Sequence, residues 1–165
     1  MQIRVQGGQP LIGDYAPSGS TNAAAACLAA ALLTSQPVTL GNLPQTTTVR
    51  TLVNLTRWLG AQHAGGGEGS PLELITDNIT QRRLTPEHTG GLIGGILFAA
   101  PILARHGYVH IGLDFPLSRI RTHLEALRDL GQAVSISAGA VEVNAVKWGY
   151  TVSYTHLTLP TNREV

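Results

Sequence analysis

The sequence predicts an α/β fold in which apolar helices lie at the centre and short strands form the outside, the inverse of an ordinary α/β barrel. Two observations carry this prediction. The chain aligns with itself at an offset of 71 residues, and the first helix of each aligned unit is apolar on nearly every side, which is typical of fully buried helices. The aligned pairs include Val38 with Val109, Gly41 with Gly112, Arg50 with Arg121 and Arg57 with Arg128.

The first unit, about residues 17–80, begins with the apolar stretch NAAAACLAAALL. A hydroxyl of Ser18 or Ser20 is expected to cap this helix, because it accepts a free amide of the first turn. Pro37 ends the helix, and the second helix carries its apolar residues on one stripe with Gly60 after it. The expected elements are helices at 20–34 and 47–59 and strands at 38–40, near Gln62 and at 72–75.

The second unit, about residues 81–151, repeats the same order. Its first helix carries the stretch GGLIGGILFAAPILA, whose glycines recur at a spacing of four and permit another helix to approach closely. A link at 76–86 carries the chain back from the first unit. The expected elements are helices at 87–105 and 118–130 and strands at 108–111, 132–137 and 140–144.

The composition excludes several classes of protein. Eleven basic and ten acidic residues give a formal net charge of +1, so there is no electrostatic case for nucleic acid binding. The longest uncharged apolar stretch, residues 90–104, is shorter than the ~20 residues of a membrane span, and the start MQIRVQGG lacks the apolar core of a signal peptide. We therefore expect a soluble, cytoplasmic protein without membrane contact.

Cysteine and histidine usage argues against a disulfide framework or a metal centre. Cys27 is the only cysteine, and among the alanines of its helix it is expected to be a small buried residue. His106 and His110 could suggest a metal pair, but Gly107 and a strand separate them, so no metal is expected.

The carboxy-terminal segment 152–165, VSYTHLTLPTNREV, resembles one translated reading frame of a DNA-sequencing adapter. The alternative is a natural β-tail, since Val, Tyr and Thr favour strands. We treat the segment as foreign and expect the preceding residues to be an amino-terminal fragment of a longer protein.

The stretches GQPLIGDYAPSGSTNAA, PVTLGNLP and TRWLGAQ resemble the enolpyruvyl transferase family over residues 2 to about 150. Within it, the branch acting on UDP-N-acetylglucosamine is more similar than the branch acting on shikimate phosphate. The resemblance implies two inside-out domains of three units each. Residues 1–16 would then be a strand segment of the partner domain, and 17–151 an incomplete inside-out barrel domain.

The resemblance also implies the chemistry. The family moves the enolpyruvyl group of phosphoenolpyruvate onto a sugar hydroxyl, here that of UDP-N-acetylglucosamine, in peptidoglycan precursor synthesis. The reaction is an addition and elimination that releases phosphate and needs no metal or organic cofactor. It requires cations around phosphate and carboxylate, and a general acid for the enol carbon.

The first family motif, Ser-Gly-x-Lys-Asn-Ala-Ala, corresponds to residues 18–24. Asn22 matches the asparagine that contacts the substrate sugar. Thr21 stands where the family has the lysine that binds phosphoenolpyruvate. The amino terminus of a helix remains an anion site without that lysine. The alternative interpretation is an ordinary capped helix.

The second motif is a loop that is shorter here, at 113–123, and lacks the family's cysteine proton donor. Asp114 is a weak candidate for a replacement acid. Arg119 is the best match to the loop arginine, Arg121 follows it, and His123 matches the final histidine. The alternative for both arginines is a solvated start of a helix.

Two hypotheses of different classes follow. In the first, the parent protein is an active enolpyruvyl transferase with a diverged loop. In the second, it is a catalytically degenerate paralogue that binds a nucleotide sugar or a partner protein. The second draws support from Thr21, from the shortened loop, and from Ile93, which stands where the family has a substrate-binding arginine. We expect the fragment alone to be inactive, because the family's site lies between two domains.

Overall fold

The structure, a computed structural model, describes residues 3–4, 7–8, 10, 12–67 and 69–146. The segment 152–165, interpreted above as foreign, lies outside the described residues. The described residues among 1–16 form neither helix nor strand. Among the described residues, no helix has the length and apolar character needed to cross a membrane.

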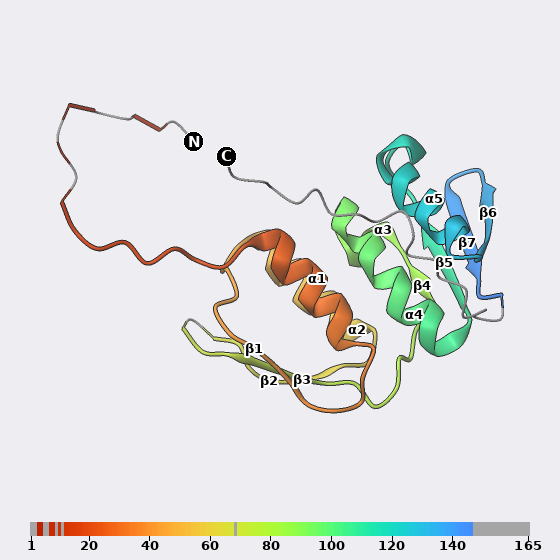
Figure 1. The fold of residues 1–165 in the computed structure, drawn as a ribbon, viewed down its shortest axis with the longest axis horizontal. Helices are drawn as coiled ribbons and strands as arrows, with labels where there is room; N and C mark the ends of the chain where they lie inside the picture. Colours follow the sequence, from red (N-terminus) through yellow and green to blue (C-terminus); the bar gives the residue numbers. More distant parts are fainter. Residues whose placement is uncertain (1–2, 5–6, 9, 11, 68, 147–165) are drawn as a thin grey trace, which may run out of the picture.

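The first half of the chain forms two helices over a small sheet (Figure 1). The sheet has the order β1-β3-β2, and both pairings are antiparallel. Each strand prediction for this half is confirmed, while the first helix ends three residues earlier than expected. The elements are α1 (Thr21–Ala31), β1 (Val38–Leu40), α2 (Thr47–Trp58), β2 (Gln62–Gly65) and β3 (Leu72–Ile75).

The second half adds a four-stranded sheet of order β4-β5-β7-β6, in which β4 and β5 are parallel and the other pairs antiparallel. The strand β4 was not predicted; it lies in the segment expected to be a link. The elements are β4 (Arg83–Leu84), α3 (Pro86–Thr89), the 3-10 helix η1 (Ile93–Phe98), α4 (Ala99–His106), β5 (Tyr108–Gly112), the 3-10 helix η2 (Leu117–Ile120), α5 (Arg121–Asp129), β6 (Ala133–Ser137) and β7 (Ala140–Asn144).

The continuous helix expected at 87–105 is a wrong prediction. The chain instead forms α3, η1 and α4 in succession. Gly90 and Gly91 adopt φ values of 61° and 66°, in the left-handed region that glycine enters without steric cost, and they end α3. Pro101 lies in the first turn of α4, where its missing amide proton is tolerated.

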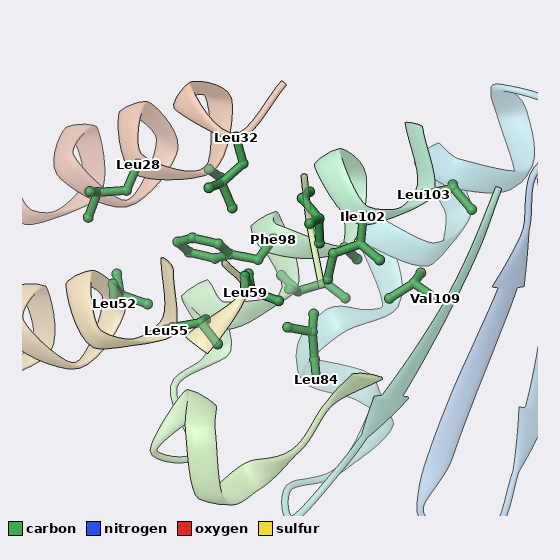
Figure 2. Close-up of a cluster of buried hydrophobic side chains, with 14 of the residues drawn as sticks. Leu28, Leu32, Leu52, Leu55, Leu59, Leu84, Phe98, Ile102, Leu103 and Val109 are labelled. Atoms are coloured by element: carbon green, nitrogen blue, oxygen red, sulfur yellow. The ribbon is translucent and has the colours of Figure 1, made fainter. Parts of the chain in front are cut away.

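One hydrophobic core joins the two halves. Figure 2 shows Phe98, at the end of η1, between leucines of α1 and α2, with Ile102 of α4 and Val109 of β5 continuing the cluster. Phe98, Leu28 and Ile102 have no exposed surface. Burial of one such side chain contributes roughly 1.5–3 kcal/mol. Because α1 and α4 are in contact and share this core, the halves form one packed body.

The expectation that α1 is buried on every side is wrong. Its buried residues lie on one face, which packs against α2, η1 and α4. Leu33, just beyond the helix, is 54% exposed. The exposed residues of the opposite face are Ala23, Ala26, Cys27 and Ala30. Cys27 is therefore exposed rather than buried, because the face that carries it packs against none of these partners.

Arg105 links the two halves by hydrogen bonds to main-chain carbonyls. Its Nη1 donates to the oxygen of Leu32 at 3.1 Å and to that of Thr76 at 2.7 Å, and its Nη2 donates to that of Asp77. The planar guanidinium presents several donors in a fixed fork, which suits three acceptors on two segments. The end of α4 is thus tied to the end of α1 and to the chain after β3.

Candidate functional site

The start of α1 is set by Ser20, whose Oγ accepts a hydrogen bond from the amide of Ala23 at 3.4 Å. Of the two capping residues left open by the sequence, the structure selects this one. Gly19 lies directly against the carbonyl oxygen of Asn42, and an added Cβ would collide with that oxygen. Asn42 itself adopts a left-handed φ of 52°. A glycine is therefore required where the chain enters α1.

A groove of about 240 Å³ lies between the first turns of α1 and the segment 39–44. Its lining includes Ser20, Ala23 and the exposed Cys27, and it contains no charged side chain. Thr21 is half-buried and Asn22 exposed at the start of the helix beside it. The partial positive charge of a helix amino terminus is the only cationic feature of α1 at this end.

The loop candidates lie around η2 and α5. Asp114 is exposed, and its Oδ2 would lie 3.0 Å from a Cβ placed on Gly91, so the loop packs against the glycine pair that ends α3. Arg119 is exposed within η2. The Nε of Arg121 donates to Oε1 of Glu125 at 3.1 Å, both side chains being well exposed.

His123 is half-buried on α5, and its Nδ1 is buried without a hydrogen-bond partner among the described residues. Figure 1 places α5 on the far side of α3 and α4 from the start of α1. The start of α1, which carries Thr21 and Asn22, and the helix α5, which carries Arg121 and His123, therefore lie in different regions of the described structure. Ile93, the first residue of η1, stands between them along the chain.

The two histidines considered as a metal pair have separate partners. The Nε2 of His106 lies 2.6 Å from the carbonyl oxygen of Ile79, and the Nδ1 of His110 lies 3.4 Å from Oε1 of Glu142. Within the described ranges, no group of three or more His, Cys, Asp or Glu side chains is placed to hold a metal ion.

The environments of two other histidines were not predicted from the sequence. The ring of His88 stacks on Trp58 with centroids 3.9 Å apart, and its Nδ1 lies 2.7 Å from Oγ1 of Thr85. His63 is held by Thr56, whose hydroxyl donates to Val53 and so accepts from the Nε2 of the imidazole at 2.9 Å. Nothing in the local sequence indicates the stacking on Trp58 or the hydrogen bond to Thr56, because those partners come from different elements.

Burial, and to a smaller extent the positive charge of Arg57, lowers the pKa of His63 to about 4. The imidazole is therefore neutral at pH 7 and adds no positive charge to its surroundings. Its second nitrogen, Nδ1, is buried with no partner among the described residues, so protonation there would place an unpaired N–H group inside the protein.

No protein-family model matches the chain. Among curated proteins, it is 33% identical over 152 residues to the UDP-N-acetylglucosamine 1-carboxyvinyltransferase of Paracoccus denitrificans, covering 90% of this chain and 36% of the relative. It is 39% identical over 139 residues to the enzyme of the same name from Bradyrhizobium diazoefficiens, covering 82% of this chain and 32% of the relative. The chain thus spans about a third of the length of these relatives.

Two solved structures share the fold. The enolpyruvyl transferase NikO from Streptomyces tendae matches with a TM-score of 0.69 at 20% identity, covering 78% of this chain and 28% of that one. An EPSP synthase from Acinetobacter baumannii matches with a TM-score of 0.51 at 16% identity, covering 74% and 28%. These likenesses show the α/β fold, and the sequence matches cover most of the chain. Over most of its length, the chain is therefore homologous to UDP-N-acetylglucosamine 1-carboxyvinyltransferases, and it shares the fold of enolpyruvyl transferases.

Proposed function

We propose that the protein containing this chain transfers the enolpyruvyl group of phosphoenolpyruvate to a hydroxyl of UDP-N-acetylglucosamine, a step of peptidoglycan precursor synthesis. The observation that carries the proposal is the match, over 82–90% of the chain, to relatives named as carboxyvinyltransferases of that nucleotide sugar. Because the chain spans about a third of their length, the activity is assigned to the longer protein.

The architecture is part of the proposal. We infer an inside-out barrel domain at 17–151, with units at about 17–80 and 81–151, that is incomplete without a third unit. The exposed apolar face of α1 supports this inference, because an apolar helix face is stabilised only when another element covers it. The exposed Ile12 and Tyr15, 95% and 85% accessible, support assigning residues 1–16 to a partner domain.

Roles for individual residues follow the family motifs. Asn22 would contact the sugar, and the amides at the start of α1 beside Thr21 would face an anionic group. Arg119, Arg121 and His123 would contribute from the loop and α5. Asp114 is the carboxylic acid proposed as the proton donor, and its exposure leaves it accessible to a substrate.

A second candidate is a paralogue that has kept the fold and lost the chemistry, binding a nucleotide sugar or a partner protein. The observation that favours it is the absence of the family's lysine, arginine and cysteine at Thr21, Ile93 and the loop 113–123. Loss of one preorganised transition-state charge typically costs ~10²–10³ in rate. Loss of a proton donor typically costs ~10²–10⁴. These effects need not multiply, because the groups act together.

The test measures phosphate release from phosphoenolpyruvate in the presence of UDP-N-acetylglucosamine, for this chain and for the protein encoded by the complete gene. We expect no turnover by the chain alone. Turnover by the longer protein supports the transferase. Binding of the nucleotide sugar by the longer protein without turnover supports the degenerate paralogue, and the absence of both overturns both proposals.

A further inference from the structure

A groove of about 220 Å³ lies between α2 and the hairpin of β2 and β3, and it shares Leu43 and Pro44 with the groove at the start of α1. Apolar side chains form part of its wall, and the main chain of two glycines in left-handed conformation forms its edge. Its lining residues are Leu43, Pro44, Gln45, Val49, Arg50, Val53, Asn54, Arg57, Gly65, Gly66 and Leu72.

Two arginines line this one groove. Arg50 and Arg57 are seven residues apart on α2, about two helical turns, so their long side chains extend from the same face. Arg57 donates from Nη1 to Oδ1 of Asn54 at 3.0 Å, and an amide oxygen carries no net charge. In the described part of the chain, no carboxylate lies within 4.0 Å of either guanidinium. Two positive charges therefore stand over a partly apolar groove.

A pair of arginines seven residues apart also lines a groove in the second half of the chain, with one chemical difference. At the offset of 71 residues, Arg121 and Arg128 correspond to the two arginines of α2, and they line a groove of about 360 Å³ with Ile136 of β6. The position corresponding to Asn54 is Glu125, which accepts a hydrogen bond from Arg121 at 3.1 Å. A carboxylate thus offsets the positive charge on α5, where α2 has a neutral amide.

We propose that the α2 groove binds a small phosphate ester, with its phosphate held by Arg50 and Arg57 and its organic part against Leu43 and Val53. The guanidinium fork matches phosphate oxygens in geometry and charge, and each such charge-assisted hydrogen bond is stronger than a neutral one. The apolar wall gives an ester an advantage over the free ion, because it removes apolar surface from water. None of its lining residues is among those assigned to enolpyruvyl transfer, and the proposal does not depend on that assignment.

The proposal is tested by titrating the chain with phenyl phosphate and with inorganic phosphate, following amide and arginine Nε–Hε signals by NMR. We expect shifts centred on α2 and tighter binding of phenyl phosphate than of phosphate. Arg57→Gln should weaken the phenyl phosphate Kd about tenfold, as expected for loss of a charge-assisted hydrogen bond. Asn54→Glu should weaken it as well, because the new carboxylate would compete for the arginines.

Arg128→Gln is the matched control, an exposed arginine at the corresponding place on α5. It should leave the Kd unchanged within about twofold, a difference well under 1 kcal/mol. Binding should also raise the pKa of His63, because the ligand offsets the positive charge of Arg57 that helps to lower it. Equal weakening by Arg57→Gln and Arg128→Gln, or weakening by neither, overturns the proposal, as does the absence of shifts on α2.

Discussion

At the scale of single residues, partners that are distant in the sequence decide the properties of the side chain. The imidazole of His63 donates to Thr56 through Nε2 and leaves Nδ1 buried without a partner among the described residues. Cys27, on an alanine-rich helix, has its thiol exposed because the helix packs on one side only. Residue type alone gives the opposite expectation for the cysteine, since a free cysteine is among the most often buried residues.

His63 should make the stability of the chain depend on pH. Its folded pKa of about 4 lies below the usual value of 6.5, so between these values the unfolded chain takes up a proton that the folded chain does not. The contribution to stability is therefore complete above about pH 6.5 and is lost as the pH falls toward 4. Urea denaturation at pH 7 and pH 4.5 should show a smaller acid loss in His63→Gln than in the parent.

His110→Gln is the control for that measurement, because His110 lies on another sheet beside Glu142. Identical pH dependence in His63→Gln and the parent would show that the imidazole is protonated without cost in the folded chain.

Cys27 should react with a maleimide in the folded chain without denaturant, because its side chain is exposed. The matched control is Ala29→Cys in a Cys27→Ala background, which places a thiol two residues away on the buried face. That thiol should react only when the chain unfolds. Mass spectrometry of timed samples measures both reactions. Protection of Cys27 in the folded chain would contradict the exposure of this face of α1. The inference of an incomplete barrel domain would then lose the support of that face.

At the scale of elements, the strands and the second helix were predictable because their signals are local. The stripe of apolar residues on α2 and the alternation of burial along β3, β5 and β7 are the periodicities expected of a helix and of half-buried strands. The prediction of a continuous helix at 87–105 was wrong because it followed a long apolar run and gave too little weight to the Gly90-Gly91 pair. That pair is a sequence signal for a turn. The strand β4 has only two residues, too few to show a period.

Gly90→Ala should destabilise the chain, because Gly90 ends α3 with a φ of 61° and a new Cβ would lie 3.0 Å from Cγ2 of Thr51. A left-handed conformation costs a residue with a Cβ roughly 1–2 kcal/mol. Gly94→Ala is the matched control, since among the described residues no atom beyond its chain neighbours and its own helix backbone lies within 4 Å of the added Cβ, and its φ is not positive. Chemical denaturation should give a lower free energy of unfolding for the first variant and an unchanged or higher one for the second.

Equal effects of the two alanine substitutions, or a stabilised Gly90→Ala, would indicate that residues 87–105 do form the continuous helix that the sequence suggested.

At the scale of the whole molecule, the sequence predicts the order of the elements. It does not predict the contacts that hold the two halves of the chain together. The candidate site shows the same limit: the resemblance supplies Asn22 and His123, while the described structure places the start of α1, which carries Asn22, apart from α5, which carries His123. Distances between units depend on packing and on long-range hydrogen bonds, which leave no periodic trace. Arg105 is the plainest case, since its three acceptors lie 28 to 73 residues away in the chain.

Arg105→Met should therefore lower the free energy of unfolding of the whole chain, rather than loosen one helix. The substitution keeps an apolar stem of similar shape but removes the donors to Leu32, Thr76 and Asp77, leaving their carbonyl oxygens without this partner. Each hydrogen bond from a charged donor contributes about 1.5–3 kcal/mol, and partial replacement by water reduces the total, so we expect a loss of at least about 2 kcal/mol. Arg128→Met, at an exposed position of α5, should have little effect on the free energy of unfolding.

Hydrogen exchange measured by mass spectrometry distinguishes a global role of Arg105 from a local one. Faster exchange in both α1 and β5 would show that Arg105 fastens the halves to each other, whereas faster exchange confined to the end of α4 would refute that role.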